Sequence, residues 1–275
     1  MNLVRSELLK IRTTAAWLWL ALGALVATAL ALVVNSWLAH LTLTGDGTEL
    51  AALPPEEAAA QQDVVGQAAN IYTSGQYFGL LFVMLIGVLM VTNEFFHQTA
   101  TTTFLSTPKR TSVIFSKLAA ASLIGFGFWL VTTIIVLVAG AAFLSFNDFG
   151  TQLGEWEVQR AILFNLLAYA IWTVLGIGVG TLITNQIGAV VTSAVVYLIG
   201  TQVAGLFFFL LSTWLESDAV MKWQVVMPSV ASSVMVNSIE SPMLPAWWVG
   251  ALVLVGYALV TGAAGILITR KRDIS

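Results

Sequence analysis

Residues 118–144, LAAASLIGFGFWLVTTIIVLVAGAAFL, contain no Asp, Glu, Lys, Arg or His. A helix rises about 1.5 Å per residue, so roughly 20 residues cross a hydrocarbon core about 30 Å thick. Five more stretches without ionisable side chains occur: Ala15–Val34, Tyr77–Thr92, Ala161–Thr184, Ile187–Leu211 and Ala246–Thr269. Tyr77–Thr92 is short for a span, so we expect its helix to begin near Ile71. The sequence predicts an all-α membrane protein of six transmembrane helices, in one domain over residues 1–275.

The overall composition agrees with this fold class. Hydrophobic residues make up 58% of the chain, charged residues only 9%, and the mean hydropathy is +0.90, which is unlike a soluble domain. Ion-driven transporters usually carry ionisable groups at membrane depth, and the six stretches have none. We therefore expect that energy for any transport enters from outside the membrane core.

Basic residues predict the orientation of the chain. Six spans put both termini on one side, and nine of the eleven basic residues fall there. They are Arg5, Lys10, Arg12, Lys109, Arg110, Lys117, Arg270, Lys271 and Arg272, which leaves Arg160 and Lys222 on the other side. The positive-inside rule then places both termini in the cytoplasm of a multi-pass protein of the cell membrane.

The N-terminal segment Met1–Thr14 has the pattern of an amphipathic helix. On a helical wheel its apolar residues Leu3, Val4, Leu8 and Ile11 share one sector, whereas Leu9 falls outside it. Such a helix would lie in the headgroup layer with its cations near anionic lipid. An ordinary positively charged flank of the first span is the alternative, and this segment alone leaves both open.

The segment between the second and third stretches, Asn93–Lys117, is the most specific feature. It has the sequence NEFFHQTATTTFLSTPKRTSVIFSK. Thr107 followed by Pro108 is a good helix start, and the helix would continue into the third span. Before it, residues 94–105 would form a short helix on the membrane surface. Glu94 and His97 lie one turn apart in it, which favours contact with the loop or a partner protein over metal or acid–base chemistry.

Two segments are expected on the outer side. In Asn35–Gln76, the run Pro54, Pro55, Glu56 and Glu57 predicts a helix start, with the helix continuing to about Asn70. We favour a solvated cap over a receptor site there. Ser212–Pro245 has three prolines yet stays apolar, which predicts backbone that dips back toward the bilayer or lies in its outer interface.

The arrangement of these segments resembles the permease subunits of type-two ABC exporters, which include drug, antibiotic-immunity, lipid and polysaccharide exporters. The resemblance rests on the basic N-terminus ending in LLKIRTT and on the Glu, Thr-rich run, Pro, basic pair and Lys of the segment after the second span. It implies paired re-entrant helices in Ser212–Pro245, an elbow helix carrying Arg5, Lys10 and Arg12, and a coupling helix that docks into a separate ATPase. The implied coupling residues are Glu94, His97, Thr101, Thr102, Phe104, Pro108, Lys109 and Arg110. The short link Thr184–Ile187 departs from the pattern, because it leaves no room for a second large coupling element.

The absence of several catalytic motifs argues against an enzymatic function of this chain. The chain has no GxxxxGK[ST] and no HExxH, its two histidines fall on opposite membrane faces, and it has no cysteine. We therefore expect no enzyme and no cofactor in this chain, with ATP and magnesium bound by the partner ATPase. A pI of about 5.3 argues against a nucleic-acid partner.

The expected function is a dimeric permease, paired with a second copy or a paralogue, that exports an amphiphilic drug, antibiotic peptide or lipid. Candidate pathway residues are Trp129, Asn165, Trp172 and Gln202. Small residues in 176–180, GIGVG, would permit close helix approach. Polysaccharide export and ion-coupled secondary transport remain the alternatives, and a membrane enzyme is disfavoured because the required residues are missing.

Overall fold

The computed structural model describes residues 2–45, 55–99, 110–239 and 244–271. Within them the chain is helical, with six helices long and apolar enough to cross a membrane, as the sequence predicts. The elements are α1 (Asn2–Arg12), α2 (Ala16–Thr44), α3 (Pro55–Gln61), α4 (Val64–Tyr72), α5 (Gln76–Phe96), α7 (Arg110–Phe146), α8 (Trp156–Leu182), α9 (Gln186–Val195), the π-helical turn η2 (Val196–Gly200), α10 (Thr201–Leu215), the 3₁₀ helix η3 (Asp218–Val226), α11 (Pro228–Val236) and α12 (Trp247–Lys271).

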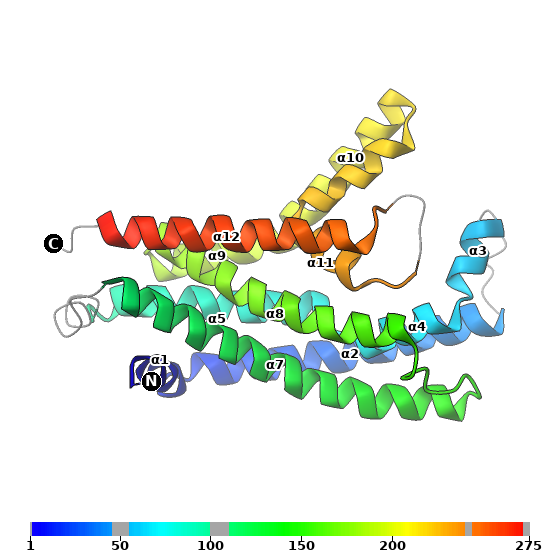
Figure 1. Ribbon diagram of the computed structural model, residues 1–275, viewed down its shortest axis with the longest axis horizontal. Helices are drawn as coiled ribbons and strands as arrows, with labels where there is room; N and C mark the ends of the chain where they lie inside the picture. Colours follow the sequence, from blue (N-terminus) through cyan, green and yellow to red (C-terminus); the bar gives the residue numbers. More distant parts are fainter. Residues whose placement is uncertain (1, 46–54, 100–109, 240–243, 272–275) are drawn as a thin grey trace.

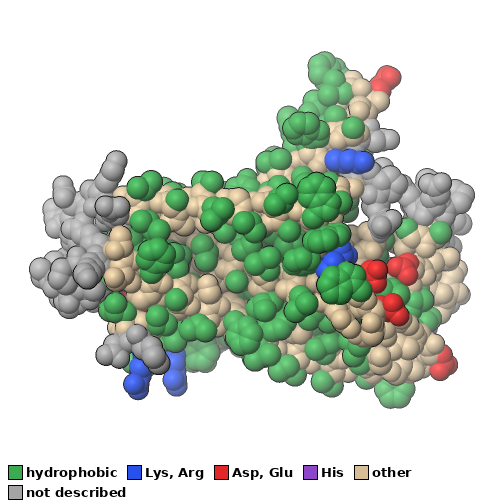
Figure 2. Space-filling model, viewed as in Figure 1, with side chains coloured by type: hydrophobic (Ala, Val, Ile, Leu, Met, Phe, Trp, Pro, Cys, Tyr) green, Lys and Arg blue, Asp and Glu red, His purple; other side chains and the backbone are tan. Residues whose placement is uncertain are grey.

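The long helices run side by side, and both termini lie at the same end of the bundle (Figure 1). At that end α1 is seen almost end-on in the figure, so it crosses the direction of the long helices. On the face shown in Figure 2, acidic side chains gather at the opposite end. Lys and Arg side chains are visible on this face at both ends of the bundle.

Helices α5 and α8 form the centre of the bundle, and glycines let their backbones meet. A Cβ on Gly176 would collide with the carbonyl of Met84, and one on Gly180 would lie 2.9 Å from the carbonyl oxygen of Val88. On the same helix, a Cβ on Gly178 would lie 2.9 Å from the Cβ of Thr261 on α12. The small-residue run thus provides close helix approach, as predicted.

The outer helices expose apolar side chains, as expected where the surrounding solvent is lipid. Helix α10 has no buried residue, and α2 buries only Ala24, Thr28 and Ala39. In Figure 1 α10 leans away from the other helices. By contrast, the two spans that contain α5 and α8 have the largest fractions of buried residues.

The second span is longer than predicted, because α4 and α5 together form it. They are separated at Gly75, whose φ of +81° favours glycine and whose Cβ would lie 2.6 Å from the Cα of Thr28. The helix start predicted in the run from Pro54 to Glu57 is confirmed at Pro55, but the predicted continuation to about Asn70 is wrong: α3 ends at Gln61, and the Asp63 side chain accepts hydrogen bonds from Val65 and Gly66 to start α4. The carboxylate of Asp63 thus caps the start of α4.

The apolar segment before the last span contains two short helices, η3 and α11. The two are bent by 106° at Met227, which is the geometry of a broken span or a re-entrant pair. Pro228 supplies the first residue of α11, where its missing N–H is not needed. Helix α11 buries Ala231, Ser232 and Met235 among others, so protein covers this backbone as the sequence requires.

Candidate functional site between α1, α5 and α7

Four charged side chains meet where α1 lies against the ends of α5 and α7. One carboxylate oxygen of Glu7 is 2.6 Å from Nζ of Lys117, and the other is 2.7 Å from Nζ of Lys10. Oε1 of Glu94 is 2.5 Å from Lys10 and 3.1 Å from Lys117. Two carboxylates and two ammonium groups thus form a closed ring with no net charge, which we call the ion-pair ring.

Most of the ring is shielded from solvent. The side chains of Glu7, Glu94 and Lys117 are 5%, 7% and 8% exposed, whereas that of Lys10 is 37% exposed. Lys117 also donates to the backbone carbonyl of Met90 at 3.0 Å. Buried charges persist only when they are paired and hydrogen bonded, and here each has at least two partners.

The amphipathic pattern of α1 holds Glu7 in place. Val4, Leu8 and Ile11 pack against a small apolar cluster from α5, α7 and α8 that includes Met90 and Ala121. Leu9 is exposed, as the helical wheel indicates, but Leu3 is also exposed despite its place in the predicted apolar sector. Leu3 therefore lies beyond the surface that α1 covers, whereas its neighbour Val4 packs on it.

The ring shifts the pKa values of the two groups on α1. Burial alone would raise the pKa of Glu7, but the charge of Lys117 and hydrogen bonds from both lysines outweigh it, so this pKa lies below its ordinary value. Burial alone would lower the pKa of Lys10, yet hydrogen bonds to Glu7 and Glu94 raise it above its ordinary value. Both groups are therefore charged at neutral pH.

The ring stands directly beside the two chain ends that flank residues 100–109. Glu94 is in the last turn of α5, and Lys117 is about two turns from the start of α7. Next to them, a cavity of about 360 Å³ is lined by ring members and by Asn93, His97 and Thr99, among others. Gln186 at the start of α9 donates to Asn93 at 2.8 Å. The ring therefore joins α1 to both helices that flank residues 100–109.

The structure corrects part of the predicted coupling segment. Glu94 does not begin a separate surface helix; it belongs to α5, which ends at Phe96 with His97 as its cap. The His97 ring packs edge-on against Phe96 with centroids 5.0 Å apart. Thr101, Thr102, Phe104, Pro108 and Lys109 lie outside the described residues, and Arg110 is the first residue of α7. The elbow candidates Arg5 and Arg12 are exposed on α1, and only Lys10 of the three joins the ring.

The four predicted pathway residues lie on three helices: Trp129 on α7, Asn165 and Trp172 on α8, and Gln202 on α10. Trp129 donates to the carbonyl of Ile162 at 3.2 Å, and Gln202 is exposed on α10. Asn165 is buried on α8, and its Oδ1 has no hydrogen-bond partner among the described residues.

Trp172 belongs to a buried polar cluster beside α11. Its indole donates to Ser232 on α11 at 2.7 Å, and its ring centroid is 4.9 Å from that of Tyr197 in the π-helical turn. The Tyr197 hydroxyl donates to the carbonyl of Tyr77 at 2.6 Å. The hydroxyl groups of Thr201 and Ser229 are hydrogen bonded to each other, with 2.8 Å between their oxygens. This cluster joins η2 to α11, and π-helical turns of this kind are frequent at functional sites.

Sequence reasoning missed Glu7 altogether and did not select Lys117 as a site residue. The i, i+3 spacing of Glu7 and Lys10 was a usable signal. The pairing of Glu7 with Lys117 was not, since the two are 110 positions apart. Among the described residues, no group of three or more metal-ligating side chains comes together. Comparison with models of protein families and with curated proteins finds no match to this chain.

Proposed function

We propose that this chain is the membrane-spanning permease of an ABC exporter, driven by a separate ATPase subunit that docks at residues 93–107. The observation that carries the proposal is the ion-pair ring. It ties α1 to both helices that flank the proposed docking segment, and the segment's sequence resembles the coupling region of type-two exporters. A force applied to that segment would reach α5 at the core and α1 at the membrane surface together.

The proposed cargo is an amphiphile such as a drug, an antibiotic peptide or a lipid. The middle parts of the six spans have no Asp, Glu, Lys, Arg or His, whereas the buried charges of the ring sit at the ends of the spans and neutralise each other. A proton-coupled carrier needs a group at membrane depth that changes its protonation during the cycle. ATP bound by a partner meets the energy requirement without such a group.

A second copy or a paralogue would complete the transporter. Helices α2, α10 and α12 turn apolar side chains outward, and α10 has no buried residue. Some of this surface faces lipid in any arrangement. The remainder is available to a second permease chain, in a membrane whose cytoplasmic side holds both termini.

The test replaces residues 99–107 with a Gly/Ser linker of equal length in the reconstituted complex with its ATPase. Stimulation of ATP hydrolysis and ATP-dependent efflux of a fluorescent amphiphile should both be lost. The matched control replaces residues 46–54, also nine positions, and should keep both activities. Normal stimulation with the first linker, or amphiphile flux by this chain alone along an imposed proton gradient, would overturn the proposal.

A further inference from the structure

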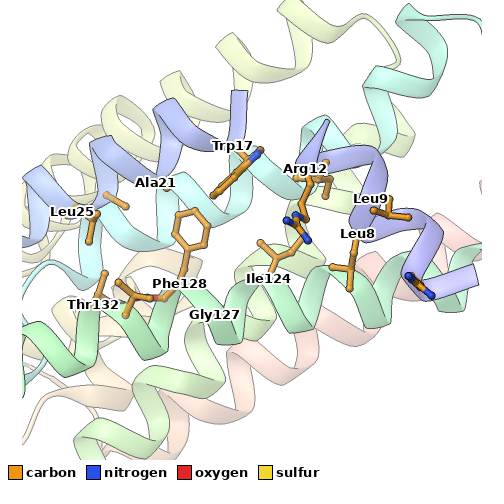
Figure 3. Close-up of a pocket in the computed structure, with 14 residues that line it drawn as sticks. Leu8, Leu9, Arg12, Trp17, Ala21, Leu25, Ile124, Gly127, Phe128 and Thr132 are labelled. Atoms are coloured by element: carbon orange, nitrogen blue, oxygen red, sulfur yellow. Dashed lines mark hydrogen bonds between the residues drawn. The ribbon is translucent and has the colours of Figure 1, made fainter. Parts of the chain in front are cut away.

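A second cavity lies on the other side of α1, between that helix and the first turns of α2. It has a volume of about 510 Å³, within the range of ligand sites. Its walls come from three helices: Leu8, Leu9 and Ile11 of α1, Trp17, Ala21, Ala24 and Leu25 of α2, and Ile124, Gly127, Phe128, Val131 and Thr132 of α7. Figure 3 shows α1, α2 and α7 around this space, with Phe128 of α7 lying toward α2.

Most residues that line this cavity are apolar, but two cations on α1 also line it. Arg5 and Arg12 are both exposed, and within the described part of the chain neither forms an ion pair. This differs from the neighbouring Lys10, whose charge is neutralised in the ring. Two unneutralised guanidinium groups beside an apolar cavity attract a ligand that has an anionic head and an apolar tail.

Trp17 adds a polar group to the lining of the cavity. Its indole Nε1 is buried and has no hydrogen-bond partner among the described residues. Figure 3 shows Trp17 at the start of α2, next to Arg12 on α1. Buried indole N–H groups usually find an acceptor, and an ester or phosphate oxygen of a lipid supplies one.

The lower part of the cavity owes its width to a glycine. A Cβ placed on Gly127 would meet no atom within 4 Å, so this position opens the wall rather than tightening a helix contact. Leu9 and Val131 at the rim are 49% and 48% exposed, so the cavity opens at the side of the bundle, where acyl chains lie. An acyl chain entering there would replace bulk lipid on the α2 and α7 walls.

We infer that this cavity binds one anionic phospholipid from the leaflet beside α1. Its phosphate lies between Arg5 and Arg12, and one acyl chain lies along Gly127 and Phe128 between α2 and α7. The protein recognises the headgroup by its negative charge, because the groups that contact it are the two guanidinium cations of α1. The inference does not depend on what the protein transports, since it concerns only the binding of a membrane lipid beside α1.

The experiment is native mass spectrometry of the full chain in mild detergent, titrated with dioleoyl phosphatidylglycerol. Dioleoyl phosphatidylcholine, with the same chains and no net charge, is the comparison lipid. One phosphatidylglycerol should be retained in preference to phosphatidylcholine. Arg5→Gln and Arg12→Gln should each weaken its binding about fivefold, as removal of roughly one cation–lipid interaction implies. Lys222→Gln, an exposed cation on η3, is the matched control and should change nothing.

A second variant tests the acyl-chain position without removing charge. Gly127→Leu should fill the cavity and abolish the retained phosphatidylglycerol, whereas Gly262→Leu on α12, where a Cβ also meets open space, should not. Inorganic phosphate should not compete. Equal retention of both lipids, or wild-type retention by the Arg5→Gln/Arg12→Gln double variant, would overturn the inference. So would a Gly127→Leu variant that keeps the lipid and loses only a dimer, because a second copy would then be the occupant.

Discussion

Removing Lys117 should destabilise the protein by an amount that depends on Glu7. Lys117→Met leaves two buried carboxylates to share Lys10 and removes one donor to the carbonyl of Met90. Breaking a buried ion pair from one side costs about 3–5 kcal/mol, and we expect roughly 3 kcal/mol because Lys10 remains. Glu7→Gln leaves Lys117 paired only with Glu94, at the longer distance of 3.1 Å, and should cost about 2 kcal/mol.

The double variant Glu7→Gln/Lys117→Met distinguishes a ring whose members are energetically coupled from two independent contacts. With both Glu7 and Lys117 neutral, the pair between Lys10 and Glu94 at 2.5 Å is intact and carries no excess charge. The double variant should therefore cost about 3 kcal/mol rather than the roughly 5 kcal/mol of an additive pair, a coupling of about 2 kcal/mol.

The assay is reversible unfolding in mixed micelles with increasing SDS, followed by tryptophan fluorescence. Glu7→Gln combined with Arg160→Gln is the control, because Arg160 bonds to Asn237 and Ser238 at another site and the two effects should add. Additive costs for Glu7→Gln and Lys117→Met, within about 0.5 kcal/mol, would refute the ring as an energetic unit.

Three further outcomes are expected. Because the pKa of Glu7 is lowered in the fold, its ionised form stabilises the protein above the unfolded pKa near 4.5, and this stabilisation is lost as the pH falls below that value. The free energy of unfolding should therefore fall less on acidification for Glu7→Gln than for the wild type, and identical pH dependence of the two would contradict this. Gly176→Val should prevent assembly of the α5–α8 core, since its Cβ would meet the carbonyl of Met84, whereas Gly262→Val should be tolerated in the same expression and melting assay. A cysteine at exposed Ala59 on α3, in a chain with no other thiol, should react with an impermeant reagent from outside intact cells; labelling only after the cytoplasmic side is opened would reverse the orientation.

The sequence by itself determined the membrane fold. In lipid each backbone group must be satisfied within its own helix, so a span has to be a long apolar run and is visible in the chain. The amphipathic α1 and the glycine run of α8 were visible for a similar reason, because a helix repeats every 3.6 residues. Ser212–Pro245 was predicted to dip or lie in the interface because its prolines and apolar residues suit neither a straight span nor a solvated loop.

Only the tertiary structure decided where the charges meet. Glu7, Glu94 and Lys117 come from three helices, and the choice of partner depends on how α1 is seated and rotated, which no local pattern encodes. The same holds for the pairing of Trp172 with Ser232 and for the cavity beside Trp17, since both arise between elements distant in the chain. Side chains on a helix are placed by its period, but their neighbours are placed by packing, and packing is a property of the whole bundle.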